Sequence, residues 1–222
     1  SSGMPRPVHI DFLGYEGNLT DEAEADLNVI VEPRYGALPP RRPAPEAADI
    51  EEAVKTLKKA KKPVLVVGRG VVVSGARDIV NKLVDTHSIP VASSVDGKGI
   101  VSDDHPLSLG PVGTYCKPCA NKIVSEADCV VFVGTNTGDQ VTKNWTLPTL
   151  GTQVIQIDID PHELGKNYPG AVGICGDAAA ALTMLADALP KDLKFGDWSE
   201  KAASCIREWK ESVESQRTSG NQ

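Results

Sequence analysis

Two short runs in the middle of the chain contain apolar residues only. They are Val64–Val67 and Cys129–Val133, and a third run, Val154–Asp160, is apolar apart from a few polar residues. Runs of this kind are typical of strands that are buried on both faces, as in a parallel sheet covered by helices. Shorter segments at 89–93 and 172–175 predict two further strands, the second of them a candidate edge strand.

Helical spacing fills the segments between these runs. Ile50, Val54 and Leu57 fall on one face of a helix that Asp49 is expected to cap. Residues 103–106 are expected to lie in a long loop that leads to 109–113. Further helices are expected over 76–86, over 117–126, and from Gly176-Asp177 to Leu189. This alternation predicts an α/β fold: a doubly wound, mostly parallel sheet with helices on both faces, Rossmann-like and of the NAD/FAD-binding type.

Both ends of the chain differ from this regular middle. Residues 1–48 contain two short candidate strands, at 7–12 and 28–31, followed by a proline-rich stretch. Such a stretch is typical of an extended linker. Residues 191–222 are polar at first and then form a charged helix that fades into a second linker. The sequence therefore predicts a compact domain at 49–190 with an extended arm at each end.

Charge and cysteine content exclude several classes of protein. The net charge of −7 makes nucleic acid an unsuitable partner, because phosphates repel an acidic surface. No apolar run approaches the roughly 20 residues that span a bilayer, so no membrane partner is expected. The five cysteines are odd in number and irregularly spaced, which indicates reduced thiols in a cytoplasmic protein.

A glycine turn after the first buried run is the clearest candidate for ligand binding. Gly68-Arg69-Gly70 follows Val67 directly, and a helical pattern begins near Ser74-Gly75-Ala76. A strand, a glycine turn and a helix are the plan of a phosphate-binding corner, because helix amides face the anion. Val73 stands where the third glycine of G-x-G-x-x-G would be, so a turn that only packs helix against sheet is the alternative.

Two further turns should meet the first one at the same edge of the sheet. Gly134–Asp139 follows the second run, and Asp158-Ile159-Asp160 ends the third. Open α/β sheets bind ligands at the carboxyl ends of their strands. Asp158 or Asp160 could accept hydrogen bonds from a ribose there, or could cap the next turn instead. We therefore predict a ligand-binding crevice that these three turns line.

Other reactive side chains form no catalytic set. Cys116 and Cys119 make a C-x-x-C at the start of a predicted helix, which suits a redox pair, whereas zinc would need a second ligand pair that is absent. Asp103-Asp104 beside His105 is either an acid–base cluster or a polar surface loop. The remaining cysteines are expected to be small apolar fillers: Cys129, Cys175 and Cys205.

Several segments, taken in order, resemble one known family. PVHID at 7–11 resembles the last strand of the pyrimidine-binding domain in thiamine-diphosphate enzymes of the acetohydroxyacid synthase and pyruvate decarboxylase group. The later segments resemble that group's central domain: KPVLVVGRGV, IPVASSVDGKG, HPLSLGPVG, EADCVVFVGTNTGDQVT, VIQIDIDPHELGKNYP and a closing Gly176-Asp177.

The resemblance implies a parent enzyme with pyrimidine-binding, central and pyrophosphate-binding domains. It assigns 1–48 to the tail of the first domain and its linker, 49–190 to the central domain, and 191–222 to a helix leading to the third domain. Thiamine diphosphate and Mg²⁺ would be held by the two other domains. This segment alone is therefore expected to bind neither and to have no catalytic or metal-binding residues, and the intact enzyme is expected to be a homodimer or homotetramer.

In the synthase branch, the resemblance also implies a site for FAD or ADP on the central domain. Carried over residue by residue, the diphosphate would meet Gly68, Arg69 and Gly70. Asn136 and Gln140 stand where that branch usually has arginines, so FAD, ADP and no ligand are all left open. The rest of the ligand would meet a larger set: Ser94, Val95, Gly113, Gly134, Asn136, Asp139, Asp158, Ile159, Gly176 and Asp177.

Two functions follow as hypotheses. The first is the central scaffold and assembly domain of an acetolactate synthase-like carboligase or decarboxylase that acts on 2-keto acids, with a vestigial FAD or ADP site. The alternative is a stand-alone nucleotide- or FAD-binding protein similar to a domain of an electron-transfer flavoprotein.

Overall fold

The computed structural model describes residues 3–4, 6–9, 32–36 and 41–219. The chain divides into two compact units, Ser1–Arg41 and Arg42–Gln222. In the described part of the first unit, the regular structure is one short helix, α1 (Pro33–Gly36). Residues 6–9 form no strand, and the rest of the candidate strand at 7–12, like that at 28–31, lies outside the described residues.

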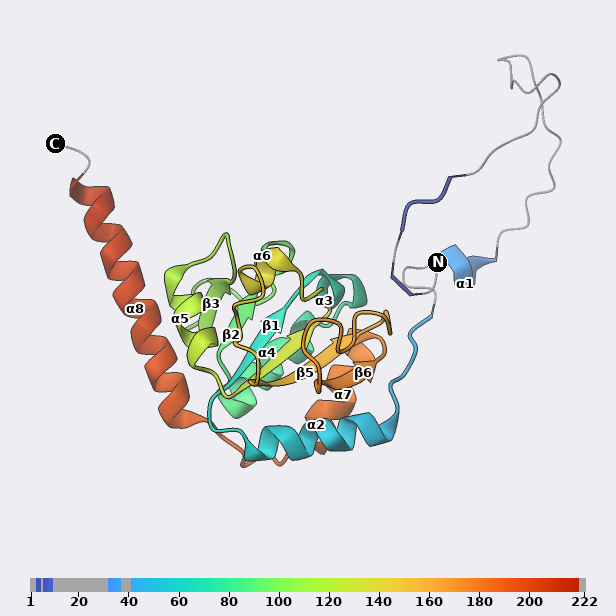
Figure 1. The fold of residues 1–222 in the computed structure, drawn as a ribbon. Coiled ribbons are helices and arrows are strands. Elements are labelled where there is room, and N and C mark those ends of the chain that lie inside the picture. The colour runs from blue at the N-terminus through green and yellow to red at the C-terminus, as the bar shows by residue number, and fades with distance from the viewer. Residues whose placement is uncertain (1–2, 5, 10–31, 37–40, 220–222) are drawn as a thin grey trace, which may run out of the picture. The chain divides into compact units, whose positions relative to one another are not determined.

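Six parallel strands form one sheet in the second unit (Figure 1). They are β1 (Pro63–Val67), β2 (Val91–Ser93), β3 (Ser108–Pro111), β4 (Cys129–Val133), β5 (Gln153–Asp158) and β6 (Val172–Cys175). Their order is β3-β2-β1-β4-β5-β6. The order of the strands reverses between β1 and β4, which makes this pair the switch point of a doubly wound sheet. The predicted fold class is confirmed.

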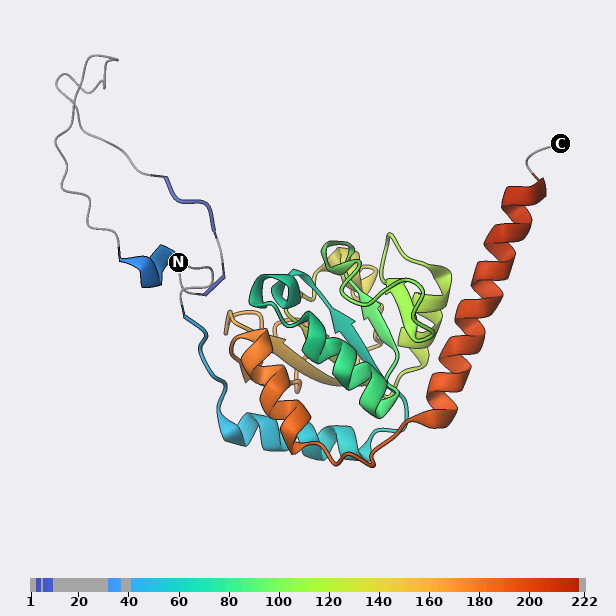
Figure 2. The same ribbon diagram turned by 180° about the vertical axis from the view of Figure 1, so that it is seen from behind.

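Helices connect the strands and cover the sheet. Figure 2 shows α4 and α7 on the face turned toward the viewer, while α5 lies on the face that is turned forward in Figure 1. Right-handed crossovers between parallel strands require helices on both faces once the strand order reverses. The helices are α2 (Ala47–Lys59), α3 (Arg69–Ser74), α4 (Arg77–His87), the short η2 (Val95–Gly97), α5 (Pro118–Glu126), α6 (Asp139–Thr142), α7 (Ala178–Ala188) and α8 (Gly196–Ser219).

The centre of the core is the pair formed by β1 and β4. Every residue of both strands is buried, and their register pairs Val66 with Phe132 and Val67 with Val133. Phe132 also stacks on Tyr168, with ring centroids 5.7 Å apart. Because helices cover both faces, neither strand can carry a polar side chain toward water, and the uninterrupted apolar runs follow from that.

The sequence misses several short elements. One is the edge strand β3, whose Ser-Leu-Gly-Pro sequence gives a weak strand signal. The helix expected over 76–86 is confirmed as α4, but the short helix α3, which begins at Arg69 directly after the glycine turn and ends before Gly75 (φ +69°), is not predicted. One local prediction is wrong. Asp49 does not cap α2: the helix starts at Ala47, after Glu46, and Asp49 lies in its first turn.

The C-terminal helix α8 is fastened to the domain at its first half. The indole Nε1–H of Trp198 donates to the carbonyl of Pro63, 3.0 Å away, at the start of β1. Three further residues of α8 are buried: Ala202, Cys205 and Ile206. The ammonium of Lys117 lies 4.8 Å from the ring centroid of Trp209, which adds a cation–π contact between α8 and the start of α5. None of the described helices is long and apolar enough to cross a membrane.

Candidate functional site

The turns after β1, β4 and β5 do meet at one edge of the sheet, as the sequence predicts. Backbone hydrogen bonds join them directly. The amide of Gly68 donates to Val133, at 2.9 Å, and the amide of Gly70 donates to Gly134, at 2.8 Å. The amide of Gly134 donates in turn to Ile157, at 2.8 Å. The turn after β1 is therefore bonded to the turn after β4, and that second turn is bonded to the end of strand β5.

The glycines in these turns have side-chain positions that are already filled by protein atoms. A Cβ atom on Gly68 would lie 2.3 Å from the Cβ of Thr135, and one on Gly70 would lie 2.6 Å from the Cα of Gly134. Gly134 also has a φ of +56°, in the left-handed region that favours glycine. The close approach of the two turns thus explains why glycine stands at each of these positions.

The polar side chains that the sequence places at the glycine turns are exposed. Arg69, Asn136 and Asp139 are all exposed, as is Gln140. Asp139 is the first residue of α6, where a carboxylate suits the positive end of a helix. This rim therefore carries one cation, on α3, and one acid, on α6, among the predicted residues.

The β2 side of the edge contributes Ser94, Val95 and Gly113. The hydroxyl of Ser94 accepts the amide of Gly97 at 3.1 Å and so caps η2, while Val95 is exposed. Gly113 is held between elements: its amide donates to Oδ1 of Asn121 at 2.8 Å. A Cβ atom on Gly113 would lie only 1.8 Å from the carbonyl oxygen of Gln140. Each of these residues has a structural partner or faces solvent.

Asp158 ends β5 in a buried position. Its Oδ1 accepts the amide of Asp160 at 2.9 Å, which is the turn-capping alternative that the sequence left open. Burial raises the pKa of Asp158, partly offset by that hydrogen bond, and nearby Glu163 raises it further. The neighbouring Ile159 is half-buried. A carboxyl group of this kind is easier to protonate than a free one, and one of its oxygens is already used by the turn.

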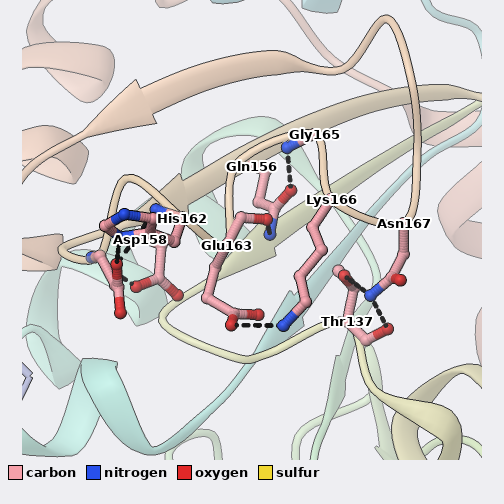
Figure 3. A network of polar contacts seen from close by, with 9 residues as sticks. Thr137, Gln156, Asp158, His162, Glu163, Gly165, Lys166 and Asn167 are labelled. Carbon is pink, nitrogen blue, oxygen red and sulfur yellow. Dashed lines mark hydrogen bonds and ion pairs between the residues drawn. The ribbon is translucent and has the colours of Figure 1, made fainter.

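A polar network holds the loop that follows Asp158 (Figure 3). The buried amide of Gln156 donates to the carbonyl of Glu163 at 2.7 Å and accepts the amide of Gly165 at 3.1 Å. Asn167 donates to the carbonyl and hydroxyl of Thr137, at 2.8 and 2.9 Å. The loop is thereby tied both to its own strand and to the turn after β4.

Gly176 and Asp177, at the start of α7, are engaged by the segment that precedes α2. Asp177 caps α7 by accepting the amides of Ala179 and Ala180, each at 3.1 Å. Its own amide donates to the carbonyl of Pro43 at 2.9 Å, and Arg42 approaches its carboxylate at 3.0 Å. A Cβ atom on Gly176 would lie 3.0 Å from the nitrogen of Pro45.

The cysteines and the acidic loop show no reactive arrangement. Cys119 is buried at the start of α5, and burial raises its pKa, which opposes the low thiol pKa of a redox pair. Cys175 is exposed, so its prediction as an apolar filler is wrong, whereas Cys129 and Cys205 are buried as predicted. Within the described ranges, no three His, Cys, Asp or Glu side chains come together in a way that could hold a metal ion.

His105 in the acidic loop contacts a carboxylate outside that loop. Its Nε2 lies 3.0 Å from Oδ1 of Asp85 on α4. Asp103, two residues before it, instead pairs with Lys117 at 3.0 Å. The polar-surface interpretation of this loop fits these separate partners better than an acid–base cluster does.

Comparison with known proteins identifies the domain. Residues 50–185, more than half of the chain, match the family model of the thiamine pyrophosphate enzyme central domain. The chain belongs to this family. Its six-stranded parallel sheet with β1 and β4 at the switch point is the central domain's fold, and the match covers the sheet and most of α7.

Three relatives show what larger proteins carry a similar central domain. A probable acetolactate synthase large subunit of Methanococcus aeolicus is 33% identical over 220 residues, 98% of this chain and 36% of the relative. The corresponding protein of Methanocaldococcus jannaschii is 35% identical over 191 residues, which are 85% of this chain and 32% of the relative. A glyoxylate carboligase of Escherichia coli O157:H7 is 32% identical over 209 residues, which are 94% of this chain and 33% of the relative. This chain thus spans about a third of the length of these relatives.

Two features of the site gave no usable signal in the sequence. Arg42 looks like one more charge in a proline-rich stretch, and only the fold brings it to Asp177, 135 positions later. Ser93 ends β2 with a buried hydroxyl that has no hydrogen-bond partner among the described residues, and it lines a small pocket with Lys98 and Gly110. The sequence gives no reason to single out a serine in a short predicted strand, because it does not show that the hydroxyl is buried.

Proposed function

We propose that this chain is the central scaffold and assembly domain of an acetolactate synthase-like enzyme that uses thiamine diphosphate to join or cleave 2-keto acids. The match to the central-domain family carries the proposal. The names of the relatives support the carboligase branch, since acetolactate synthases and a glyoxylate carboligase are among them.

The scaffold role is supported by how the predicted site residues are used. Gly68, Gly70 and Gly134 pack turn against turn, and Asp177 caps a helix. When bound in such an enzyme, thiamine diphosphate supplies the stabilised carbanion that the reaction needs. That group and its Mg²⁺ would be held by pyrimidine- and pyrophosphate-binding domains, which are the partners proposed for this chain, in a homodimeric or homotetrameric enzyme.

Under this proposal, the crevice at the carboxyl edge is the remnant of an FAD or ADP site. The alternative function, a stand-alone FAD-binding protein similar to an electron-transfer flavoprotein domain, is favoured only by the strand order, which dinucleotide-binding folds share. It predicts a yellow purified protein with a flavin absorbance band, whereas the scaffold function predicts a colourless one.

Activity of the isolated chain tests the scaffold function. The purified 222-residue protein is incubated with pyruvate, thiamine diphosphate and Mg²⁺, and acetolactate is measured. No product above the protein-free blank is expected, because under the proposal thiamine diphosphate and Mg²⁺ would be held by the two other domains. Acetolactate formed in proportion to the concentration of this chain would overturn the proposal.

A further inference from the structure

The turns after β1 and β4 form a contact that we call the glycine lock, consisting of Gly68, Gly70, Gly134 and Thr135. Its backbones approach so closely that no Cβ atom fits at Gly70, where it would lie 2.6 Å from the Cα of Gly134. The same holds in reverse, since a Cβ atom on Gly134 would lie 2.6 Å from the Cα of Gly70. The contact is mutual, so both glycines are needed for it.

The hydrogen bonds of the lock use donors that a phosphate group would require. An anion bound at a glycine turn is held by backbone amides that point at it. Here the amides of Gly68, Gly70 and Gly134 donate to carbonyls of Val133, Gly134 and Ile157. Because each bond is 2.8–2.9 Å long, a phosphate could take these amides only by breaking bonds that join the turn after β1 to β4 and its turn, and the turn after β4 to β5.

The far end of the crevice is also filled by this chain. The carboxylate of Asp177 accepts the amides of Ala179 and Ala180 and pairs with Arg42. Pro43 and Pro45 lie against Gly176, one of the predicted ligand contacts. Asp158, between the two ends, is buried with its Oδ1 already accepting a hydrogen bond from Asp160.

From these contacts we infer that the crevice does not take the diphosphate of FAD or ADP. The glycine lock joins β1 to β4 at the switch point of the sheet and serves the stability of the domain. The glycine pattern that resembles a dinucleotide fingerprint is thus kept here by packing between turns. This inference goes beyond the scaffold function, since a scaffold domain could still hold a colourless nucleotide such as ADP.

Two measurements on the 222-residue protein test the inference. In the first, Gly70→Ala is compared with Gly138→Ala by thermal unfolding. Gly138 lies on the same edge, has an ordinary φ of −74°, and a Cβ atom added there would meet nothing within 4 Å. Gly70→Ala is expected to lower Tm by about 5 °C or more, since overpacking against backbone is costly, and Gly138→Ala by no more than about 2 °C. Equal Tm values for the two variants would contradict the claim that the glycine lock stabilises the domain.

In the second measurement, FAD and ADP are titrated separately into the wild-type chain and into Arg69→Ala, followed by calorimetry. No saturable binding is expected, up to about 1 mM ligand. One-to-one binding that Arg69→Ala weakens by about tenfold or more, a change of about 1.4 kcal/mol, would place the diphosphate at the turn and overturn the inference. Binding that the variant leaves unchanged would lie elsewhere and support it. Neither result changes the outcome expected in the acetolactate assay. The inference about the crevice and the proposed scaffold function can therefore be refuted independently.

Discussion

The carboxylate of Asp177 lies 3.0 Å from the guanidinium of Arg42, although the two residues are 135 positions apart in the chain. The same Arg42 nitrogen also donates to the carbonyl of Ser74 at the end of α3. Asp177 is almost fully buried, whereas the side chain of Arg42 is 43% exposed. This relationship fastens the end of the proline-rich segment to the start of α7 and marks where the second unit begins.

Substitutions of Asp177 and of Arg42 should together separate the cap from the ion pair. Asp177→Ala removes both the acceptor for two amides of α7 and the partner of Arg42, and it is expected to lower the free energy of unfolding by about 1–2 kcal/mol. Arg42→Ala leaves the cap and removes the half-exposed ion pair and the donor to Ser74, at an expected cost below about 1 kcal/mol because solvent screens such pairs. Urea denaturation of both variants gives the comparison. A larger loss in Arg42→Ala than in Asp177→Ala would show that the ion pair, rather than the cap, dominates.

Trp198 should contribute more to stability than the exposed Trp145 does. Trp198→Phe leaves the buried carbonyl of Pro63 without its 3.0 Å hydrogen bond, at an expected cost of about 1–3 kcal/mol. Trp145→Phe is the matched control, because Trp145 is 52% exposed and its loss should cost no more than about 0.5 kcal/mol. Urea denaturation followed by circular dichroism measures both variants. Similar costs would mean that α8 is not anchored through Trp198.

The raised pKa of Asp158 predicts a pH-dependent effect of Asp158→Asn. Because burial raises the pKa of this carboxyl group in the folded protein, folding favours its protonated form. Its contribution to stability is therefore fully present below the pKa of an unfolded aspartate and is lost as pH rises through the raised value. An asparagine keeps the acceptor for Asp160 and has no charge to bury.

Asp158→Asn is thus expected to be more stable than the wild type at about pH 7, with the difference disappearing toward pH values of about 3–4. Chemical denaturation across this pH range measures the difference. Asp187→Asn, at an exposed position on α7, is the control and should show no such trend. A loss of stability in Asp158→Asn near neutral pH would mean that the ionised carboxylate has a favourable partner in the folded protein.

Thiol reactivity should follow burial rather than the C-x-x-C spacing. Burial raises the pKa of Cys129 to about 12 and also raises that of Cys119, so both should resist iodoacetamide at about pH 8 in the folded protein. Cys175 is exposed and should be alkylated sooner than either. Mass spectrometry of timed samples identifies the labelled residues, with urea-unfolded protein as the control. Rapid labelling of Cys119 would contradict this prediction and would support a redox role for the C-x-x-C pair.

The sequence predicted the sheet well because its central strands are buried on both faces. The runs at 64–67 and 129–133 admit one interpretation, and the structure places them side by side as β1 and β4. β3 was missed because an edge strand of serine, glycine and proline has neither an apolar run nor alternation. The whole of α3 was missed because glycine and β-branched valine are poor helix formers, and tertiary contacts are what hold a six-residue helix.

The candidate site was predicted in outline but not in its contacts. The sequence places the turns after β1, β4 and β5 on one edge, since parallel strands share a carboxyl edge. It could not show that Gly70 and Gly134 fill each other's side-chain space, because they are far apart in the sequence and neither has a side chain to signal a contact. The engagement of Asp177 by Arg42 depends in the same way on the completed fold.

A domain exchange can show whether this chain serves as the central domain of an acetolactate synthase-like enzyme. Residues 42–219 replace the matching segment of the Methanocaldococcus jannaschii relative, and acetolactate formation from pyruvate is measured with and without thiamine diphosphate. We expect a folded chimera whose cofactor-dependent activity stays within about tenfold of the parent enzyme, a loss of no more than about 1.4 kcal/mol. A chimera that folds and assembles like the parent but forms no acetolactate would contradict the scaffold function.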